Sequence, residues 1–155
     1  MARTRAPELS EQQLDAWKAF LRAQAELIRT LDREMEAEQG LPITFFDVLA
    51  QLSNAGGQLR MSELADAVLL SRSGVTRVVD RMVRKGLVRR EQCETDRRAS
   101  YATLTAAGKR ALTQAMPVHF RGIEEHFGRH LSCDEAKTLA TALGRMVSSQ
   151  DGDAC

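Results

Sequence analysis

The sequence predicts a mostly α-helical protein that carries one small β-hairpin. Aromatic residues make up only 5% of the 155 residues and prolines number three, a composition that favours helices over β-sandwiches. Apolar residues recur three and four positions apart through most of the chain, as on the buried face of a helix. That period is lost between residues 87 and 104, where two short extended stretches follow one another.

A long first helix is predicted over residues 10–39. Ser10 is a suitable N-cap, and Gly40 followed by Pro42 ends the helix. Phe20 and Leu27 widen its apolar stripe beyond what a helix needs to cover its own domain. The stripe is a heptad seam of Leu14, Trp17, Leu21, Gln24, Ile28, Leu31 and Met35. We therefore interpret this segment as a dimerisation helix preceded by a disordered stretch at 1–9, with dimer contacts from Leu14, Trp17, Leu21 and Ile28.

The central region begins with three short helices. Thr44 can cap the first of them, and a glycine-rich break follows it. Gln58–Arg60 is predicted to be a short extended connector. A second helix begins near Ser62, and a third follows after a turn of only a few residues, over 71–86. The buried stripe of the third helix is predicted to contain Val75, Val78, Val79, Met82 and Val83.

Two further helices are predicted at the C-terminal end. Thr105 can cap a long helix that extends to about residue 129, and Pro117 should kink or break it. Ser132 and Glu135 form a capping box for the last helix. We interpret residues 105–148 as C-terminal dimerisation helices and residues 149–155 as a disordered tail. The last helix is expected to contribute Leu139 and Leu143 to the dimer.

A charged β-hairpin follows the three central helices. Its strands are predicted at Leu87–Glu91 and Ser100–Leu104, with Cys93–Arg98 between them. Helix, short turn, helix and basic hairpin is the order of a winged helix-turn-helix domain. We assign that fold to residues 44–104.

Charge is distributed unevenly along the chain, although the net charge is only +1. Residues 71–98 carry nine Lys or Arg against four Asp or Glu, whereas residues 8–38 carry four basic against eight acidic side chains. Binding to a polyanion depends on the local field rather than on the total charge. One basic segment on an otherwise neutral protein is typical of a compact DNA-binding surface.

The outward face of the 71–86 helix predicts contact with double-stranded DNA. This surface has a single acid, Asp80, among several arginines and short hydroxyl side chains. Arginine pairs with guanine or holds a phosphate, and Ser or Thr near a helix start reaches phosphates and base edges. The candidate DNA-binding residues of the helix are Ser71, Arg72, Ser73, Thr76, Arg77, Arg81 and Arg84.

Several central motifs resemble the MarR (multiple antibiotic resistance regulator) family of bacterial transcription factors. They are Met61-Ser-Glu-Leu-Ala65, Ser71–Arg81, Lys85-Gly-Leu-Val-Arg89 and Asp96-Arg-Arg98 followed by Leu104-Thr-Ala-Ala-Gly108. The resemblance implies a homodimer joined by the first and last two helices, usually a repressor, and often a small-molecule effector. It also implies that Arg98 enters the minor groove and that Asp96 holds the arginine, so Asp96, Arg97 and Arg98 join the candidate DNA-binding residues.

Other function classes are disfavoured by what the sequence lacks. We find no apolar segment long enough to span a membrane and no secretory signal, which predicts a cytoplasmic protein without a membrane partner. No catalytic motif stands out, so we predict no enzyme activity, no cofactor and no metal. The alternative is a winged-helix protein-interaction module that has lost DNA binding.

Three weaker signals leave alternatives open. Trp17, Phe45, Phe46 and Tyr101 line an apolar effector pocket in one interpretation and are core residues in the one we prefer. His119, His126 and His130 share one helical stripe, which suits a metal site or a pH switch less well than polar packing at a helix interface. The cysteines Cys93, Cys133 and Cys155 are widely spaced free thiols, and redox sensing by Cys93 or Cys133 is the less favoured interpretation.

Overall fold

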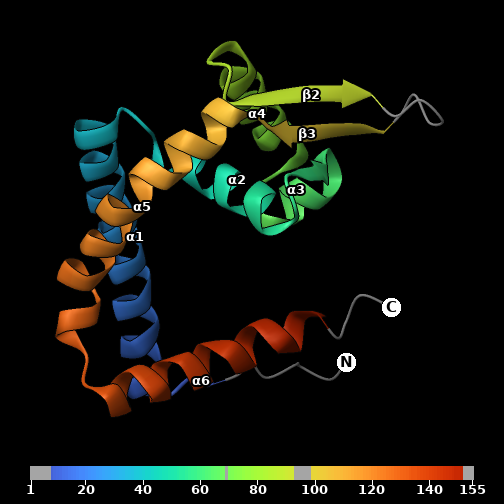
Figure 1. Cartoon of the computed structure of the whole chain (residues 1–155). Coiled ribbons are helices and arrows are strands. Elements are labelled where there is room, and N and C mark those ends of the chain that lie inside the picture. Colours follow the sequence, from blue (N-terminus) through green and yellow to red (C-terminus); the bar gives the residue numbers. More distant parts are fainter. Residues whose placement is uncertain (1–7, 69, 93–98, 152–155) are drawn as a thin grey trace, which may run out of the picture.

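A computed structural model describes residues 8–68, 70–92 and 99–151. Two parts are joined by the long helix α5, with the three-stranded sheet and three helices at one end and α6 at the other (Figure 1). The mostly helical fold with a small hairpin is confirmed. The elements are α1 (Glu11–Gln39), α2 (Ile43–Asn54), β1 (Gln58–Arg60), α3 (Met61–Ala67), α4 (Arg72–Arg84), β2 (Val88–Gln92), β3 (Ser100–Leu104), α5 (Ala106–His126), the 3₁₀ turn η1 (Gly128–His130) and α6 (Cys133–Asp151).

Local hydrogen bonds fix the helix starts where short hydroxyl residues precede them. Ser10 is the predicted N-cap and forms a capping box with Gln13, and Thr105 Oγ1 accepts a hydrogen bond from Gly108 N at 3.0 Å. Ser132 Oγ accepts a hydrogen bond from Glu135 N, and the Glu135 carboxylate accepts one from Ser132 N, as the predicted capping box requires. These caps place α1, α5 and α6 within a few residues of their predicted positions.

One apolar core holds together the winged end, which contains α2, α3, α4 and the three-stranded sheet. Its largest fully buried side chains come from α2, α3, α4 and the end of α1, and include Phe45, Leu49, Leu64, Val79 and Met35. α5 closes this core through Leu112, Ala115 and Val118. The outer part of α5 packs along α1 (Figure 1). These two helices and α6 form a helical arm, and α1 and α5 connect it to the winged end.

The sheet has one more strand than expected. β2 and β3 form the predicted antiparallel hairpin, with Val88 opposite Leu104 and Gln92 opposite Ser100. β1, which we expected to be only an extended connector, pairs antiparallel with the other edge of β3 and gives the order β1-β3-β2. The partner of β1 lies more than 40 residues away, so its pairing is invisible to local sequence patterns.

The start of α2 and the end of α4 differ from the predicted ones. Thr44 is not the N-cap of α2, because the helix begins one residue earlier and Asp32 Oδ1 of α1 accepts a hydrogen bond from Ile43 N at 2.8 Å. In α4, Val75, Val79 and Met82 are buried as predicted, but Val83 is exposed because it lies in the last turn, where the helix leaves the core.

The two C-terminal helices also differ in detail. Pro117 does not break α5, which continues through it to His126, and Gly128–His130 forms a separate 3₁₀ turn instead of the predicted end of the helix. α6 extends to Asp151, three residues beyond its predicted end, so the predicted tail at 149–155 is partly helical. No helix among the described residues is long and apolar enough to cross a membrane.

Gly108→Ala is expected to destabilise the fold by about 1 to 3 kcal/mol, because a methyl group has no room at this position. A Cβ there would overlap the carbonyl oxygen of Leu87, which is fixed by hydrogen bonds from Thr105, and would lie 2.9 Å from Leu104 Cδ1. Gly144→Ala in α6 is the control, because its Cβ would meet nothing within 4 Å. Urea unfolding checks both, and equal stability of the two variants would contradict the packing described.

Candidate nucleic-acid interface

The start of α4 is built for close approach by a ligand. Ser71 is the N-cap of α4, and its Oγ accepts a hydrogen bond from Gly74 N at 3.0 Å and lies 3.2 Å from Ser73 Oγ. Thr76 Oγ1 donates to the carbonyl oxygen of Arg72 at 2.9 Å, one turn back. Small and short side chains therefore surround the first turn of α4, and none of them covers its exposed surface.

The exposed face of α4 is positively charged. Arg72, Arg77 and Arg84 are exposed, and within the described part of the chain none of them has an ion-pair partner. The one acid of this face, Asp80, accepts a hydrogen bond from Arg90 of β2, with Nη1 and Oδ1 3.0 Å apart. The acid is thereby neutralised by the neighbouring strand, and a net positive surface remains.

Arg81, on the flank of α4, has a contact that the sequence did not predict. Its guanidinium carbon sits 5.1 Å from the ring centroid of Phe45, and the side chain borders a hollow whose other residues include Asp32 of α1 and Thr44 of α2. This position over an aromatic face gives a cation–π contact, which suits a packing role. Arg81 is exposed, and its assignment to the candidate DNA-binding residues stays a prediction.

The predicted tip of the hairpin lies outside the described residues. Asp96, Arg97 and Arg98 belong to this part of the chain, as does Cys93. β2 and β3, the two strands on either side of the tip, are described and lie side by side (Figure 1). The assignments of Asp96, Arg97 and Arg98 therefore stay predictions.

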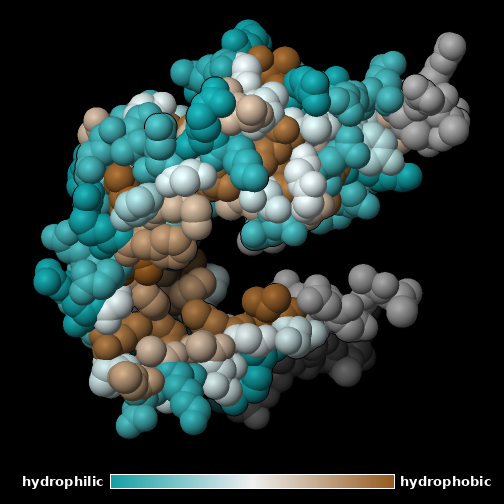
Figure 2. Space-filling model, in the orientation of Figure 1, coloured by the Kyte–Doolittle hydropathy of each residue, from teal (hydrophilic) through white to brown (hydrophobic). Residues whose placement is uncertain are grey.

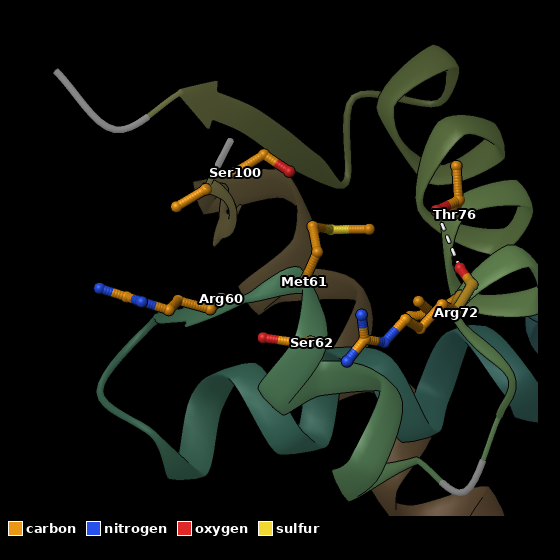
Figure 3. A pocket seen from close by; sticks show the side chains of 8 residues that line it. Arg60, Met61, Ser62, Arg72, Thr76 and Ser100 are labelled. Atoms are coloured by element: carbon orange, nitrogen blue, oxygen red, sulfur yellow. Dashed lines mark hydrogen bonds between the residues drawn. The ribbon is translucent and has the colours of Figure 1, made fainter. Parts of the chain in front are cut away.

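A cavity beside α4 contains residues that the sequence analysis did not select. It lies between the junction of β1 and α3, the first turn of α4 and the start of β3, and has a volume of about 430 Å³. Figure 3 shows Arg72 reaching from α4 toward Ser62, while Arg60 extends from the end of β1 away from both. The sequence analysis did not select Arg60, because its contact with Tyr101 depends on the pairing of β1 with β3, which no local pattern reveals.

Comparisons with known proteins agree with this geometry. A model of the MarR family matches residues 39–99. The uncharacterized HTH-type transcriptional regulator YkoM of Bacillus subtilis (strain 168) is 32% identical over 133 residues, which cover 86% of this chain and 84% of YkoM. The crystal structure of AbsC, a MarR family transcriptional regulator from Streptomyces coelicolor, is similar with a TM-score of 0.85 at 30% identity, covering 96% of this chain and all of AbsC. The chain belongs to the MarR family of transcriptional regulators.

The resemblance inferred from the central motifs is thus confirmed, as is the winged helix-turn-helix fold. A second MarR family regulator from Streptomyces coelicolor, Sco3205, was solved in complex with DNA. It is similar with a TM-score of 0.86 at 28% identity, covering 96% of this chain and 92% of Sco3205. The similarity extends beyond the winged domain to the helical arm, because the matches span nearly the whole chain.

The helical arm of this MarR family member exposes large apolar side chains. Trp17 is 56%, Leu21 44% and Ile28 43% exposed, and Leu14 is similarly accessible. An apolar groove of about 510 Å³ lies between α1, α5 and α6, and Leu139 and Leu143 of α6 line it together with Ile28. Figure 2 shows apolar surface gathered in the hollow beside α6. Of the residues predicted for dimerisation, Ile28, Leu139 and Leu143 line this groove, and Leu14, Trp17 and Leu21 are exposed on α1 outside it. Leu31 and Met35 of the same seam are buried within the chain.

The four aromatic residues considered for an effector pocket are not brought together. Phe45 is fully buried in the core, and Phe46 packs against His119 with ring centroids 4.3 Å apart. Trp17 lies on the exposed part of α1 beside Phe20, and Tyr101 of β3 contacts Arg60. None of the four lines the apolar groove of the arm. The preferred interpretation as core residues is correct for Phe45 and Phe46.

The histidine stripe is divided among different contacts. His119 packs against Phe46 with tilted rings, His126 Nε2 lies 2.6 Å from Glu34 Oε1 of α1, and His130 is exposed in the 3₁₀ turn. The described residues contain no group of three or more His, Cys, Asp or Glu side chains placed to hold a metal ion. Cys133 is exposed at the first residue of α6.

The buried ring of His119 is expected to lower the free energy of unfolding in acid. Burial of the ring lowers the pKa of His119 below its ordinary value, and the Asp47 carboxylate partly opposes this shift. Below the ordinary histidine pKa of about 6.5, the unfolded chain binds a proton that the folded chain does not, so acidification favours unfolding. His119→Phe keeps an aromatic ring against Phe46 and removes this effect.

We therefore expect the unfolding free energy of His119→Phe to rise relative to the wild type as the pH falls from about 7.5 to 5.5. Urea unfolding at fixed protein concentration measures the difference at each pH. Two curves that stay parallel over this range would show that His119 titrates alike in both states.

Proposed function

We propose that this chain is a sequence-specific DNA-binding transcriptional regulator that places α4 of each subunit of a homodimer in the major groove. The observation that carries the proposal is the exposed face of α4, where Arg72, Arg77 and Arg84 have no carboxylate partner among the described residues. Asp80, the acid of the same face, is paired with Arg90. A helix with this surface after a short turn suits the major groove, where arginine reads guanine. The DNA complex of the relative Sco3205 supports the proposal.

The proposed dimer is supported by the exposed apolar surface of the helical arm. The side chains of Leu14, Trp17, Leu21 and Ile28 all lie on α1, and the groove beside them is almost entirely apolar. Soluble proteins rarely expose a continuous apolar region of this kind unless a partner covers it. We assign this partner to a second copy of the chain, joined through residues 10–39 and 105–148.

A two-fold dimer would recognise a near-palindrome with half-sites about 10 base pairs apart, one turn of the duplex. Arg98 of each hairpin would enter a flanking minor groove and Asp96 would hold it there, as the family resemblance implies. Bound near a promoter, such a dimer would exclude polymerase, so we propose that the protein is a repressor. We further propose that a small-molecule effector releases it.

Selection of bound fragments from genomic DNA tests the proposed function. The purified wild-type protein should enrich a small set of fragments that share a near-palindrome. A protein carrying both Arg77→Ala and Arg84→Ala should enrich none of them, while its circular dichroism spectrum should match that of the wild type. If the wild type enriches no fragment, the alternative of a protein-interaction module without DNA binding takes the place of this proposal. Compounds that release the enriched fragments would then identify the effector.

A further inference from the structure

Asp80 is the one acid of α4, and it lies on the exposed face of the helix. It follows Thr76 and Arg77 by one turn and precedes Arg84 by one turn, so these side chains share that face. A carboxylate turned toward DNA is repelled by the phosphates. An acid at this position therefore favours DNA binding only if it accepts a hydrogen bond from a group in the groove.

Arg90 of β2 holds the carboxylate of Asp80. Its Nη1 donates a hydrogen bond to Asp80 Oδ1 at 3.0 Å, and both side chains stay partly exposed. Ala102 of β3 lies directly opposite Arg90 and is fully buried, so the Arg90 side chain leaves the sheet on the face that packs against the helices. Arg90 therefore reaches Asp80 from a strand whose position is set by the sheet.

The second oxygen of this carboxylate can accept a further hydrogen bond. Among the described residues, Arg90 is the only hydrogen-bond partner of Asp80, and it uses Oδ1. An ionised carboxylate has acceptor sites on both oxygens, so Oδ2 can accept a bond from a group in front of α4. The charge-assisted bond to Arg90 also offsets the negative charge of Asp80, which reduces its repulsion from phosphates.

The four bases differ in what they offer to such an oxygen. In the major groove, cytosine presents only the donor of its N4 amino group, whereas guanine presents acceptors and thymine presents an acceptor and a methyl group. Adenine has a donor beside an acceptor, which suits the amide of Asn or Gln better than a carboxylate. A carboxylate on a helix in the major groove therefore selects cytosine.

We infer that Asp80 is a specificity-determining residue that accepts a hydrogen bond from N4 of one cytosine in each half-site, and that Arg90 is its positioning residue. The inference rests on the proposed function, because it requires α4 to lie in the major groove. Asp80 lies one turn from Arg77, so the cytosine is close to the guanine assigned to Arg77. Arg90 contributes without touching the base, because it holds Oδ1 and leaves Oδ2 for the groove.

A scan with N4-methylcytosine tests the inference. The modified base still pairs with guanine, but its methyl group takes the place of the amino hydrogen that faces the major groove. Each cytosine of a selected DNA fragment is replaced in turn, and the dissociation constant is measured. For the wild type, one replacement per half-site should weaken binding roughly tenfold through loss of the bond to Asp80. Asp80→Ala should lose its sensitivity to that one replacement.

Asp80→Ala should also change the affinities for two unmodified duplexes in opposite directions. Binding to the selected fragment should weaken roughly tenfold, because the contact with cytosine is lost. Binding to scrambled DNA should strengthen, because a negative charge is removed from the surface that faces the phosphates. Asp15→Ala is the matched control, because Asp15 is an exposed acid that pairs with Lys18 on α1. It should reproduce the wild type on both duplexes and throughout the scan.

Two variants of Arg90 separate positioning from folding. Arg90→Gln removes the charged partner of the Asp80 carboxylate, so the sensitivity to N4-methylcytosine at the same position should decrease. Arg90→Lys keeps a positively charged donor and should recover part of that sensitivity. A purely structural role of the pair in holding β2 against α4 would lower the free energy of unfolding and weaken binding to every sequence alike, without changing the scan.

The inference is overturned if the wild type binds the selected DNA but no cytosine replacement weakens its binding, or if Asp80→Ala keeps the full wild-type scan. Equal weakening of Asp80→Ala on the selected and the scrambled duplex would also contradict it and would assign Asp80 to the fold. The wild-type scan and Arg90→Gln decide the question even where Asp80→Ala does not fold. Failure of the wild type to bind any DNA would instead remove the proposed function.

Discussion

Leu21→Asp is expected to convert the protein from a dimer to a monomer. Leu21 is 44% exposed in the single chain and lies in the apolar stripe that we assign to the subunit interface. A second copy would bury it, and burying an unpaired carboxylate costs several kcal/mol in each subunit. Dimerisation should therefore weaken by more than about a thousandfold, since each 1.4 kcal/mol is a factor of ten. Sedimentation at micromolar concentration measures the change.

Arg22→Asp is the matched control for this prediction. Arg22 is exposed and lies next to Leu21, but on the side of α1 turned away from the apolar stripe. The same acidic side chain should leave the dimer intact at that position. The core of the winged end contains neither residue, so both variants should retain their helical signal. A wild type that sediments as a folded monomer would contradict the proposed architecture.

Arg77→Ala is expected to weaken binding to a selected operator by about 1 to 3 kcal/mol in each half-site and to relax the preference at one base pair. Arg77 lies in the middle of the exposed face of α4 and, among the described residues, has no partner that would compete for its guanidinium. Loss of a base contact reduces affinity for the operator more than affinity for scrambled DNA. Binding curves on both duplexes at several salt concentrations separate these effects.

Arg84→Ala serves as the comparison on the same helix. Arg84 is the last residue of α4, where a guanidinium is better placed for the backbone than for a base edge. Its loss should weaken binding to both duplexes similarly and flatten the salt dependence. If Arg77→Ala leaves the affinity for the operator unchanged, α4 does not read the sequence, and the protein-interaction alternative gains support.

Much of the fold follows from short-range chemistry that a sequence displays. The predicted caps Ser10, Thr105 and Ser132 bond to residues three positions away. Ser71 caps α4 in the same way. The periodic stripe of α4 likewise identified its buried residues Val75, Val79 and Met82, whereas Val78 is only half-buried and Val83 is exposed. Elements of this kind depend on neighbours along the chain.

The missed features depend on residues distant in sequence. Asp32 replaces Thr44 as the acceptor at the start of α2, and Arg81 of α4 lies over the ring of Phe45 of α2. Tyr101 was considered for an effector pocket, but the pairing of β1 with β3 places it beside Arg60. Each of these contacts joins two elements whose relative position no local pattern specifies.

The central claim is that two copies of α4 read DNA as a symmetric pair. Hydroxyl-radical footprinting of the wild type on a fragment selected from genomic DNA tests this claim most directly. We expect two protected regions centred about 10 base pairs apart on one face of the duplex, with both regions lost together in Leu21→Asp. A single protected region, or a footprint that Leu21→Asp leaves unchanged, would contradict the claim.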